Sequence, residues 1–135
     1  MMRLVVAYVA TAVVFLGLDA LWLTQIALGM YRREIGGLLL ERPNLAVSGL
    51  FYLAFIAGLV LLVVLPAVQA GSWLTALWMG AVLGLVAYGT YDFTNLATLK
   101  GWSQSLALID LAWGTALSAV AATAGYFAVS MTAVD

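Results

Sequence analysis

The sequence contains no cysteine and no histidine among its 135 residues. The absence of cysteine excludes disulfide bonds, iron–sulfur clusters, thiolate zinc sites and cysteine nucleophiles. The absence of histidine removes the commonest general base, the usual haem and zinc ligand, and every Ser–His or Cys–His arrangement. Carboxylates, hydroxyls, tryptophan and asparagine donors and a few basic residues remain, so we predict no cofactor and no resident metal centre.

Charge is also scarce, since only 8% of the residues are charged and 66% are hydrophobic. A soluble domain carries about 25% charged residues, and a chain this apolar cannot cover itself with polar surface. The net charge of −1 gives no electrostatic footprint for nucleic acid. The composition therefore predicts an integral membrane protein, with residues 1–135 as one domain and membrane lipid as its surroundings.

The N-terminus begins with Met1-Met2-Arg3 and an apolar run, which resembles a signal peptide. The run extends to about Leu28, however, and contains Asp19, Trp22 and Gln25. Because this is long for a signal peptide, we interpret it as a membrane helix.

The apolar runs predict four spanning helices of about 20 residues or more, over residues 3–29, 45–65, 73–96 and 103–129. A polar loop is expected over 31–44, with a short apolar patch at 35–40 that either lies at the membrane interface or tucks back into the bundle. Pro66 and residues 69–73 supply the second turn, and Lys100-Gly101 the third. Short connections predict an all-α, antiparallel four-helix bundle.

Basic residues are unevenly distributed between the predicted loops. The loops after the first and third helices share one side and hold Arg32, Arg33, Arg42 and Lys100, whereas the other side holds only Arg3. The positive-inside bias predicts that these two loops are cytoplasmic and that both termini lie outside.

Apart from Arg3 at the very start of the first span, the only charged residues inside the predicted spans are three aspartates, Asp19, Asp92 and Asp110. Each carboxylate costs about 2.5–3.5 kcal/mol at the centre of a membrane helix, and none has a basic residue in its own run. At a rise of 1.5 Å per residue, all three lie about 12–15 Å from the same loop side. Separate helices therefore bring carboxyl groups to one level, which predicts a shared site.

An N–H donor follows each acid at a spacing of three residues, which places both on one helix face. The pairs are Asp19 and Trp22, Asp92 and Asn95, and Asp110 and Trp113. We predict that each donor orients the acid of its own helix.

The stripe of Asp92 continues backwards through Tyr88, Gly84 and Gly80. A Gly-x-x-x-Gly pair lets helices approach closely, so this face is predicted to be the bundle interior. The two glycines are interpreted as packing residues, and Tyr88 as part of the site.

Ionised carboxylates close together in a low dielectric repel one another, so the site must hold protons, a cation or a hydrogen-bonding group. The leading hypothesis is a pocket that binds a proton, a small cation or a polar lipid group. One alternative is an intramembrane enzyme that acts on a lipid or isoprenoid through an aspartate pair. The other is a non-catalytic partner subunit whose acids join helices. The small size of the chain is compatible with a homodimer.

Several segments carry a resemblance to a known family: Leu18–Leu23 (LDALWL), Phe51-Tyr52, Tyr88–Trp102 (YGTYDFTNLATLKGW) and Asp110–Thr115 (DLAWGT). The chain resembles the small bacterial membrane proteins grouped as domain of unknown function 2177, over nearly its whole length. The resemblance implies a multi-span protein of the bacterial inner membrane. It does not name a substrate.

Overall fold

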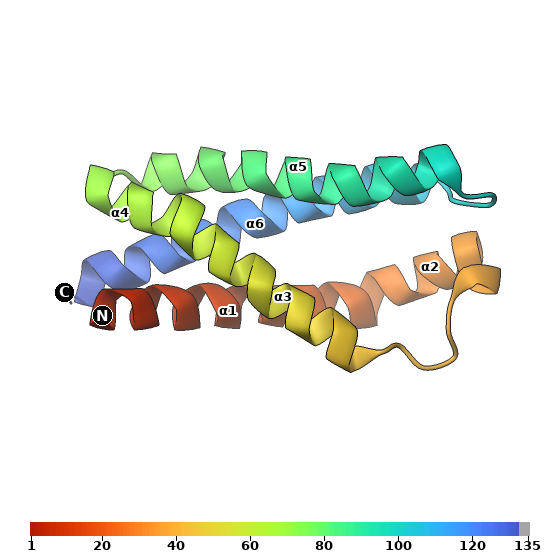
Figure 1. Cartoon of the computed structure of the whole chain (residues 1–135), viewed down its shortest axis with the longest axis horizontal. Helices are drawn as coiled ribbons and strands as arrows, with labels where there is room; N and C mark the ends of the chain where they lie inside the picture. The colour runs from red at the N-terminus through yellow and green to blue at the C-terminus, as the bar shows by residue number, and fades with distance from the viewer. Residues whose placement is uncertain (133–135) are drawn as a thin grey trace.

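The computed structural model describes residues 1–132, in which helices are joined by short connections and no strand is present. Its elements in chain order are α1 (Met2–Trp22), η1 (Leu23–Ala27), α2 (Leu28–Ile35), η2 (Gly36–Leu38), α3 (Leu45–Leu59), η3 (Val60–Val64), α4 (Leu65–Ala70), α5 (Trp73–Thr98) and α6 (Gln104–Thr132). Segments η1 and η3 are π-helical turns and η2 is a 3₁₀ turn. They continue the neighbouring helices without a break, so the elements form four long rods (Figure 1).

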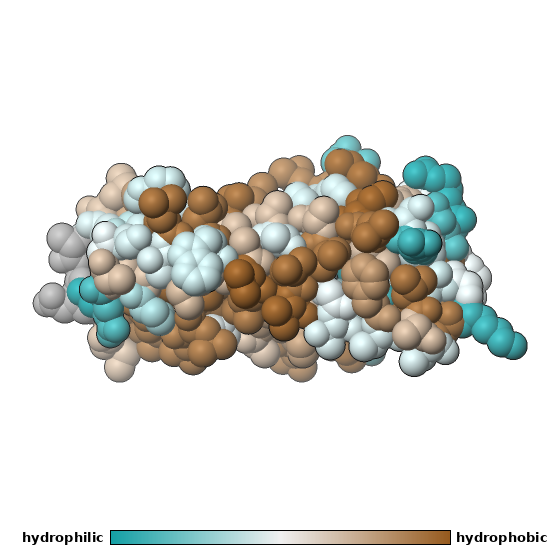
Figure 2. All heavy atoms as spheres, turned by 90° about the horizontal axis from the view of Figure 1, so that it is seen from above, coloured by the Kyte–Doolittle hydropathy of each residue, from teal (hydrophilic) through white to brown (hydrophobic). Residues whose placement is uncertain are grey.

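All four rods are long and apolar enough to cross a membrane: Met2–Leu38, Leu45–Ala70, Trp73–Thr98 and Gln104–Thr132. The start of α1 and the end of α6 lie at one end of the bundle, and the α2–α3 and α5–α6 connections lie at the other (Figure 1). Apolar atoms dominate the middle of the face in Figure 2, and hydrophilic atoms gather towards the two ends. The predicted all-α, four-helix antiparallel bundle is confirmed.

The first rod continues well beyond its predicted end at residue 29, because α2 and η2 extend it to Leu38. The charges of Arg32, Arg33 and Glu34 predict a loop, but these are exposed residues of α2. A helix loses nothing by carrying charges once it has left the hydrocarbon, so charge marks the membrane boundary here rather than the end of the helix.

The second rod likewise passes through Pro66, where the sequence predicts a turn. Proline has no backbone N–H and clashes with the preceding α-helical turn. Here the turn before it, η3, is π-helical, and Pro66 lies in the first turn of α4. A π-turn is one of the recognised ways in which a helix accommodates such a residue. The rod ends at Gly71, whose φ of 65° is left-handed.

Helix α6 is the centre of the bundle, since half of its most apolar stretch is buried and it packs along both α1 and α5. The α5–α6 contact is close because glycines line it. A Cβ added at Gly80 would lie 2.9 Å from the carbonyl oxygen of Ser118, and one at Gly84 would overlap the carbonyl oxygen of Gly114. The packing role predicted for Gly80 and Gly84 is confirmed.

Helix α3 takes a different course from the other helices. It crosses α1 at a marked angle, while its continuation through η3 and α4 packs against α5 and α6 (Figure 1). A large apolar core, centred on residues such as Phe15, Ile56 and Leu117, fills the half of the bundle near the termini. A smaller cluster around Met30 and Leu106 lies near the connections. The predicted site residues lie along the helices between these two clusters.

Candidate functional site

All three membrane aspartates are buried inside the bundle. Asp92 on α5 is fully buried, and Asp19 on α1 and Asp110 on α6 are each 5% exposed. Along α6, Asp110 lies between Leu106 of the small apolar cluster and Leu117 of the large one. The prediction that these carboxyl groups face the interior is therefore confirmed, and none of them points at the lipid.

Asp19 is held by a tryptophan from another helix. The indole Nε1–H of Trp113 on α6 donates to Oδ1 of Asp19 at 3.1 Å. The Trp113 ring also stacks on Trp22, with ring centroids 4.6 Å apart and planes only 7° from parallel. Tyr52 of α3 lies beside the same carboxyl group. Three helices thus converge on Asp19, and the stacked indoles fix its orientation.

Asp110 is held by a tyrosine that is distant in sequence. The hydroxyl of Tyr31 on α2 donates to Oδ1 of Asp110 at 3.0 Å. Tyr31 follows Asp19 by twelve positions, which in an uninterrupted α-helix would place it about 120° away around the axis. The π-turn η1 lies between them and absorbs one extra residue, which brings the two back to within about 20° of one face. The irregular turn therefore lets one rod present both Asp19 and Tyr31 to the interior.

Asp92 forms an unusual contact with a second acid. Its carboxyl group lies beside that of Asp110, between α5 and α6. Apart from that facing carboxyl group, neither oxygen of Asp92 has a hydrogen-bond partner within residues 1–132. Two acids can share such a site only if a proton or a positive charge lies between or beside them. Across the same residues, no group of three acidic side chains is arranged so that it could hold a metal ion.

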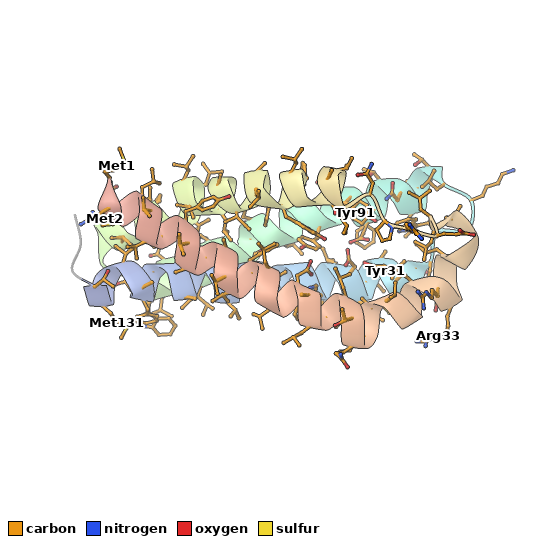
Figure 3. All side chains as sticks on the ribbon, turned by 90° about the horizontal axis from the view of Figure 1, so that it is seen from below. Met1, Met2, Tyr31, Arg33, Tyr91 and Met131 are labelled. Carbon is orange, nitrogen blue, oxygen red and sulfur yellow. The ribbon has the colours of Figure 1, made fainter. Side chains whose placement is uncertain are left out.

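A cavity of about 770 Å³ opens beside these acids. Its walls come from the first rod, α3, α5 and α6, and Asp19 and Asp110 both line it. Four tyrosines also line the cavity: Tyr31, Tyr52, Tyr88 and Tyr91. Tyr31 and Tyr91 lie in the half of the bundle near Arg33, away from Met1 and Met131 (Figure 3).

The outer wall of the cavity is apolar and exposed. Phe51 of α3 is 70% exposed and Val86 of α5 is 58% exposed, and both line the cavity. Since these side chains lie on the flanks of neighbouring rods rather than at an end of the bundle, the cavity meets the bilayer between α3 and α5. It thus has a polar inner wall and an apolar outer one.

The chain matches the model of a family described as "Predicted membrane protein (DUF2177)" over residues 4–127. The chain belongs to this family. It is therefore a membrane protein with four helices able to span the bilayer. No curated protein and no solved structure shows significant similarity to it. The resemblance inferred from the sequence is confirmed. Because the family description names no activity, the role of the site in this DUF2177 protein has to be inferred from its geometry.

The predicted pairing of each acid with a donor on its own helix is wrong. Trp113 bonds to Asp19 rather than to Asp110. Trp22 donates to neither, since its buried Nε1 has no partner within residues 1–132. An indole is much longer than an aspartate side chain, so its N–H reaches beyond its own helix turn to the neighbouring rod. A spacing of three residues gives a shared face, but it does not give contact between side chains of such different lengths.

Of the remaining predicted site residues, Tyr88 lines the cavity of this DUF2177 protein, and its ring fills the space above Gly114 on α6. Asn95 is half-buried, does not line the cavity and makes no side-chain hydrogen bond within the described residues. Trp22 lines the cavity as predicted, although it does so through its ring rather than as a donor to Asp19.

Sequence reasoning missed Tyr31, Tyr52 and Tyr91 as site residues. Tyrosine is common at membrane interfaces, so none of these residues stands out by type. Tyr31 also falls within the predicted loop. The available signal was spacing. Tyr91 follows Tyr88 by three residues on the helix that carries Asp92, and Tyr52 precedes Phe55 by three residues on a rod without any charged residue.

Proposed function

We propose that this protein binds a single lipid-like molecule in the cavity, with the polar group of the molecule at Asp19 and Asp110. The apolar chain of the ligand would leave between α3 and α5 into the bilayer. The observation that carries the proposal is the cavity itself, which has two buried carboxyl groups on its inner wall and exposed apolar side chains on its outer wall.

The size of the cavity supports a ligand larger than a proton or a bare ion. Ligand pockets in proteins commonly measure about 300–1,000 Å³, and this one falls within that range. Such pockets are mostly apolar with a few placed polar groups that fix orientation. Ser48, Thr90 and Thr94 also line the cavity. Their hydroxyl groups donate to backbone carbonyl oxygens of their own helices, which leaves the hydroxyl oxygens able to accept hydrogen bonds from a lipid head group.

We further propose that the protein lies in the bacterial inner membrane with the connections α2–α3 and α5–α6 in the cytoplasm. Arg32, Arg33, Arg42 and Lys100 lie at that end, and the positive-inside bias supports this orientation. The polar half of the cavity would then face the cytoplasmic leaflet, from which the lipid would enter.

The adjacent carboxyl groups of Asp92 and Asp110 support a second candidate function, which is acid–base chemistry on the bound lipid. Asp110, which lines the cavity, would give a proton to the lipid at one position and take one back from another position. Asp92 behind it would hold a proton between the two steps, so that the total number of protons on the pair is the same at the end as at the start. This second function predicts that the membrane lipid profile of cells changes with Asp92→Asn, whereas simple binding predicts no change.

Native mass spectrometry of the protein released from membranes tests lipid binding directly. Wild-type protein should carry one tightly held lipid. Ala87 lines the cavity, so Ala87→Phe should fill the space and remove that lipid. Ala112 is exposed on α6 and does not line the cavity, so Ala112→Phe is the matched control and should retain the lipid. Equal lipid occupancy in both variants would refute the proposal.

A further inference from the structure

We propose that the head group selected by the cavity is cationic, so that the ligand is an amphiphile with an ammonium group. This inference rests on the proposed lipid binding and adds the chemical class of the head group. It comes from the charges and aromatic rings that surround the carboxyl groups.

The charge on the cavity wall has one sign. Asp19 and Asp110 line it, and Asp92 lies directly against Asp110. No lysine or arginine lines the cavity, and the sequence has no histidine. A phosphate or carboxylate placed here would face carboxyl groups without any compensating base in a low dielectric, whereas an ammonium group would supply the missing positive charge.

The aromatic lining favours an organic cation. Tyr31, Tyr52, Tyr88 and Tyr91 surround the space from three different rods, and the ring of Trp22 adds to the same wall. A cation within about 6 Å of such a ring is attracted by its negative face, and recognition of ammonium ligands by clustered aromatic rings is a recurrent use of this effect. The hydrogen bond from Tyr31 to Asp110 also fixes that ring in place.

The arrangement suits an ammonium group better than a metal ion. Calcium needs six to eight oxygen ligands, and magnesium needs six at close to octahedral geometry. Oδ1 of Asp19 and Oδ1 of Asp110 already accept hydrogen bonds from Trp113 and Tyr31. No trio of acids converges within residues 1–132. An ammonium group needs only one or two carboxylates and draws the remaining attraction from the rings.

The surroundings of Asp92 give a further indication. This side chain is fully buried, and apart from the facing carboxyl group of Asp110 neither of its oxygens has a hydrogen-bond partner in the described residues. Burying a carboxyl group without a compensating charge or donor costs free energy, and buried polar groups in proteins usually have a hydrogen-bond partner. A cation bound at Asp110 would provide compensation for both members of the pair.

The test uses three single-chain amphiphiles with the same brominated tail, ending in a trimethylammonium, a hydroxyl or a phosphate group. Bromine quenches tryptophan fluorescence on contact. Replacing Trp73, Trp78 and Trp102 with phenylalanine leaves Trp22 and Trp113, which lie at the site, as reporters. The protein is held in nanodiscs of neutral lipid, and Ala87→Phe in the same background gives the quenching due to the bilayer alone.

We expect the ammonium probe to quench at concentrations about tenfold lower than the hydroxyl probe, with the phosphate probe weakest. The double substitution of Asp19→Asn and Asp110→Asn should abolish the advantage of ammonium over hydroxyl. Glu34 is exposed on α2 and does not line the cavity, so Glu34→Gln removes one negative charge at a distance and should leave the advantage intact.

Each result supports or overturns a distinct statement. Equal quenching by the ammonium and hydroxyl probes, above the Ala87→Phe background, would overturn cation selectivity and leave lipid binding standing. A preference for the phosphate probe would also overturn it. Quenching by all three probes at the Ala87→Phe level would overturn lipid binding itself. Should the double variant fail to fold, the ranking of the three probes on the parent protein still decides the question.

Discussion

The indole N–H of Trp113 donates to the carboxyl group of Asp19 from a position 94 residues further along the chain. This bond joins α6, the central helix, to α1 at the depth of the candidate site. It places a neutral donor rather than a base beside a buried acid. Asp19 is thereby fixed in position while its capacity to attract a positive charge is retained.

The two stacked tryptophans should differ in their contribution to stability. Trp113→Phe keeps a ring for stacking on Trp22 but deprives Asp19 of its donor, so we expect the free energy of unfolding to fall by about 1–2 kcal/mol. Trp22→Phe removes an N–H that has no partner within residues 1–132, and it should cost less. Unfolding titrations of the two variants in mixed micelles measure the difference, and a larger loss for Trp22→Phe would contradict the assignment.

Removal of the Tyr31 hydroxyl should lower lipid occupancy, whereas removal of a tyrosine hydroxyl outside the cavity should not. Tyr31→Phe leaves Asp110 without its donor and changes the polar wall, so we expect lower lipid occupancy in native mass spectra. Tyr8 is the matched control because its hydroxyl bonds to the carbonyl oxygen of Leu53, and Tyr8 does not line this cavity. Tyr8→Phe loses one hydrogen bond as well, yet it should retain the lipid. Equal occupancy in the two variants would show that Tyr31 has only a structural role.

Substitution of glycines should reveal where helices touch. Gly84→Ala would force a methyl group against the carbonyl oxygen of Gly114, and we expect a loss of about 1–3 kcal/mol in the free energy of unfolding. A methyl group added at Gly17 on α1 would meet no atom within 4 Å, so Gly17→Ala should be neutral or slightly stabilising. The comparison uses the same chemical change at two helical positions, and similar losses at both would argue against close α5–α6 packing.

The orientation of the bundle can be tested by labelling, because the chain has no native cysteine. Leu40→Cys lies at the end of the bundle with the connections, and Thr132→Cys lies at the end with the termini. A membrane-impermeant maleimide added to the outer face should label only the cysteine at 132. Labelling of the cysteine at 40 instead would reverse the proposed orientation.

The number of rods and their order could be predicted because long apolar runs determine them directly. The ends of the first two rods could not. The charges of Arg32 and Arg33 are typical of a loop, and Pro66 is typical of a turn, but each belongs to a helix that continues. In the first case the helix has already left the hydrocarbon, and in the second a π-turn accommodates the proline. Neither circumstance is visible in hydropathy.

The acids of the site could be predicted because an unpaired carboxyl group inside an apolar run is rare and costly. Their partners could not, since Trp113 and Tyr31 reach them from other rods. Those contacts depend on the rotation of each helix about its axis, and the π-turn η1 changes that rotation partway along the first rod. The cavity likewise depends on the angle at which α3 crosses its neighbours, which no local pattern encodes.

The glycine contacts between α5 and α6 have a consequence for which ligands the cavity can accept. The backbones of these two helices approach closely at Gly84 and Gly114, so α5 and α6 together form one continuous side of the cavity. The other walls of the cavity come from α3 and from the first rod, and the continuation of α3 through η3 and α4 packs against α5 and α6. The connection at residues 39–44 joins the first rod to α3, so its length determines how far apart those two walls of the cavity can lie.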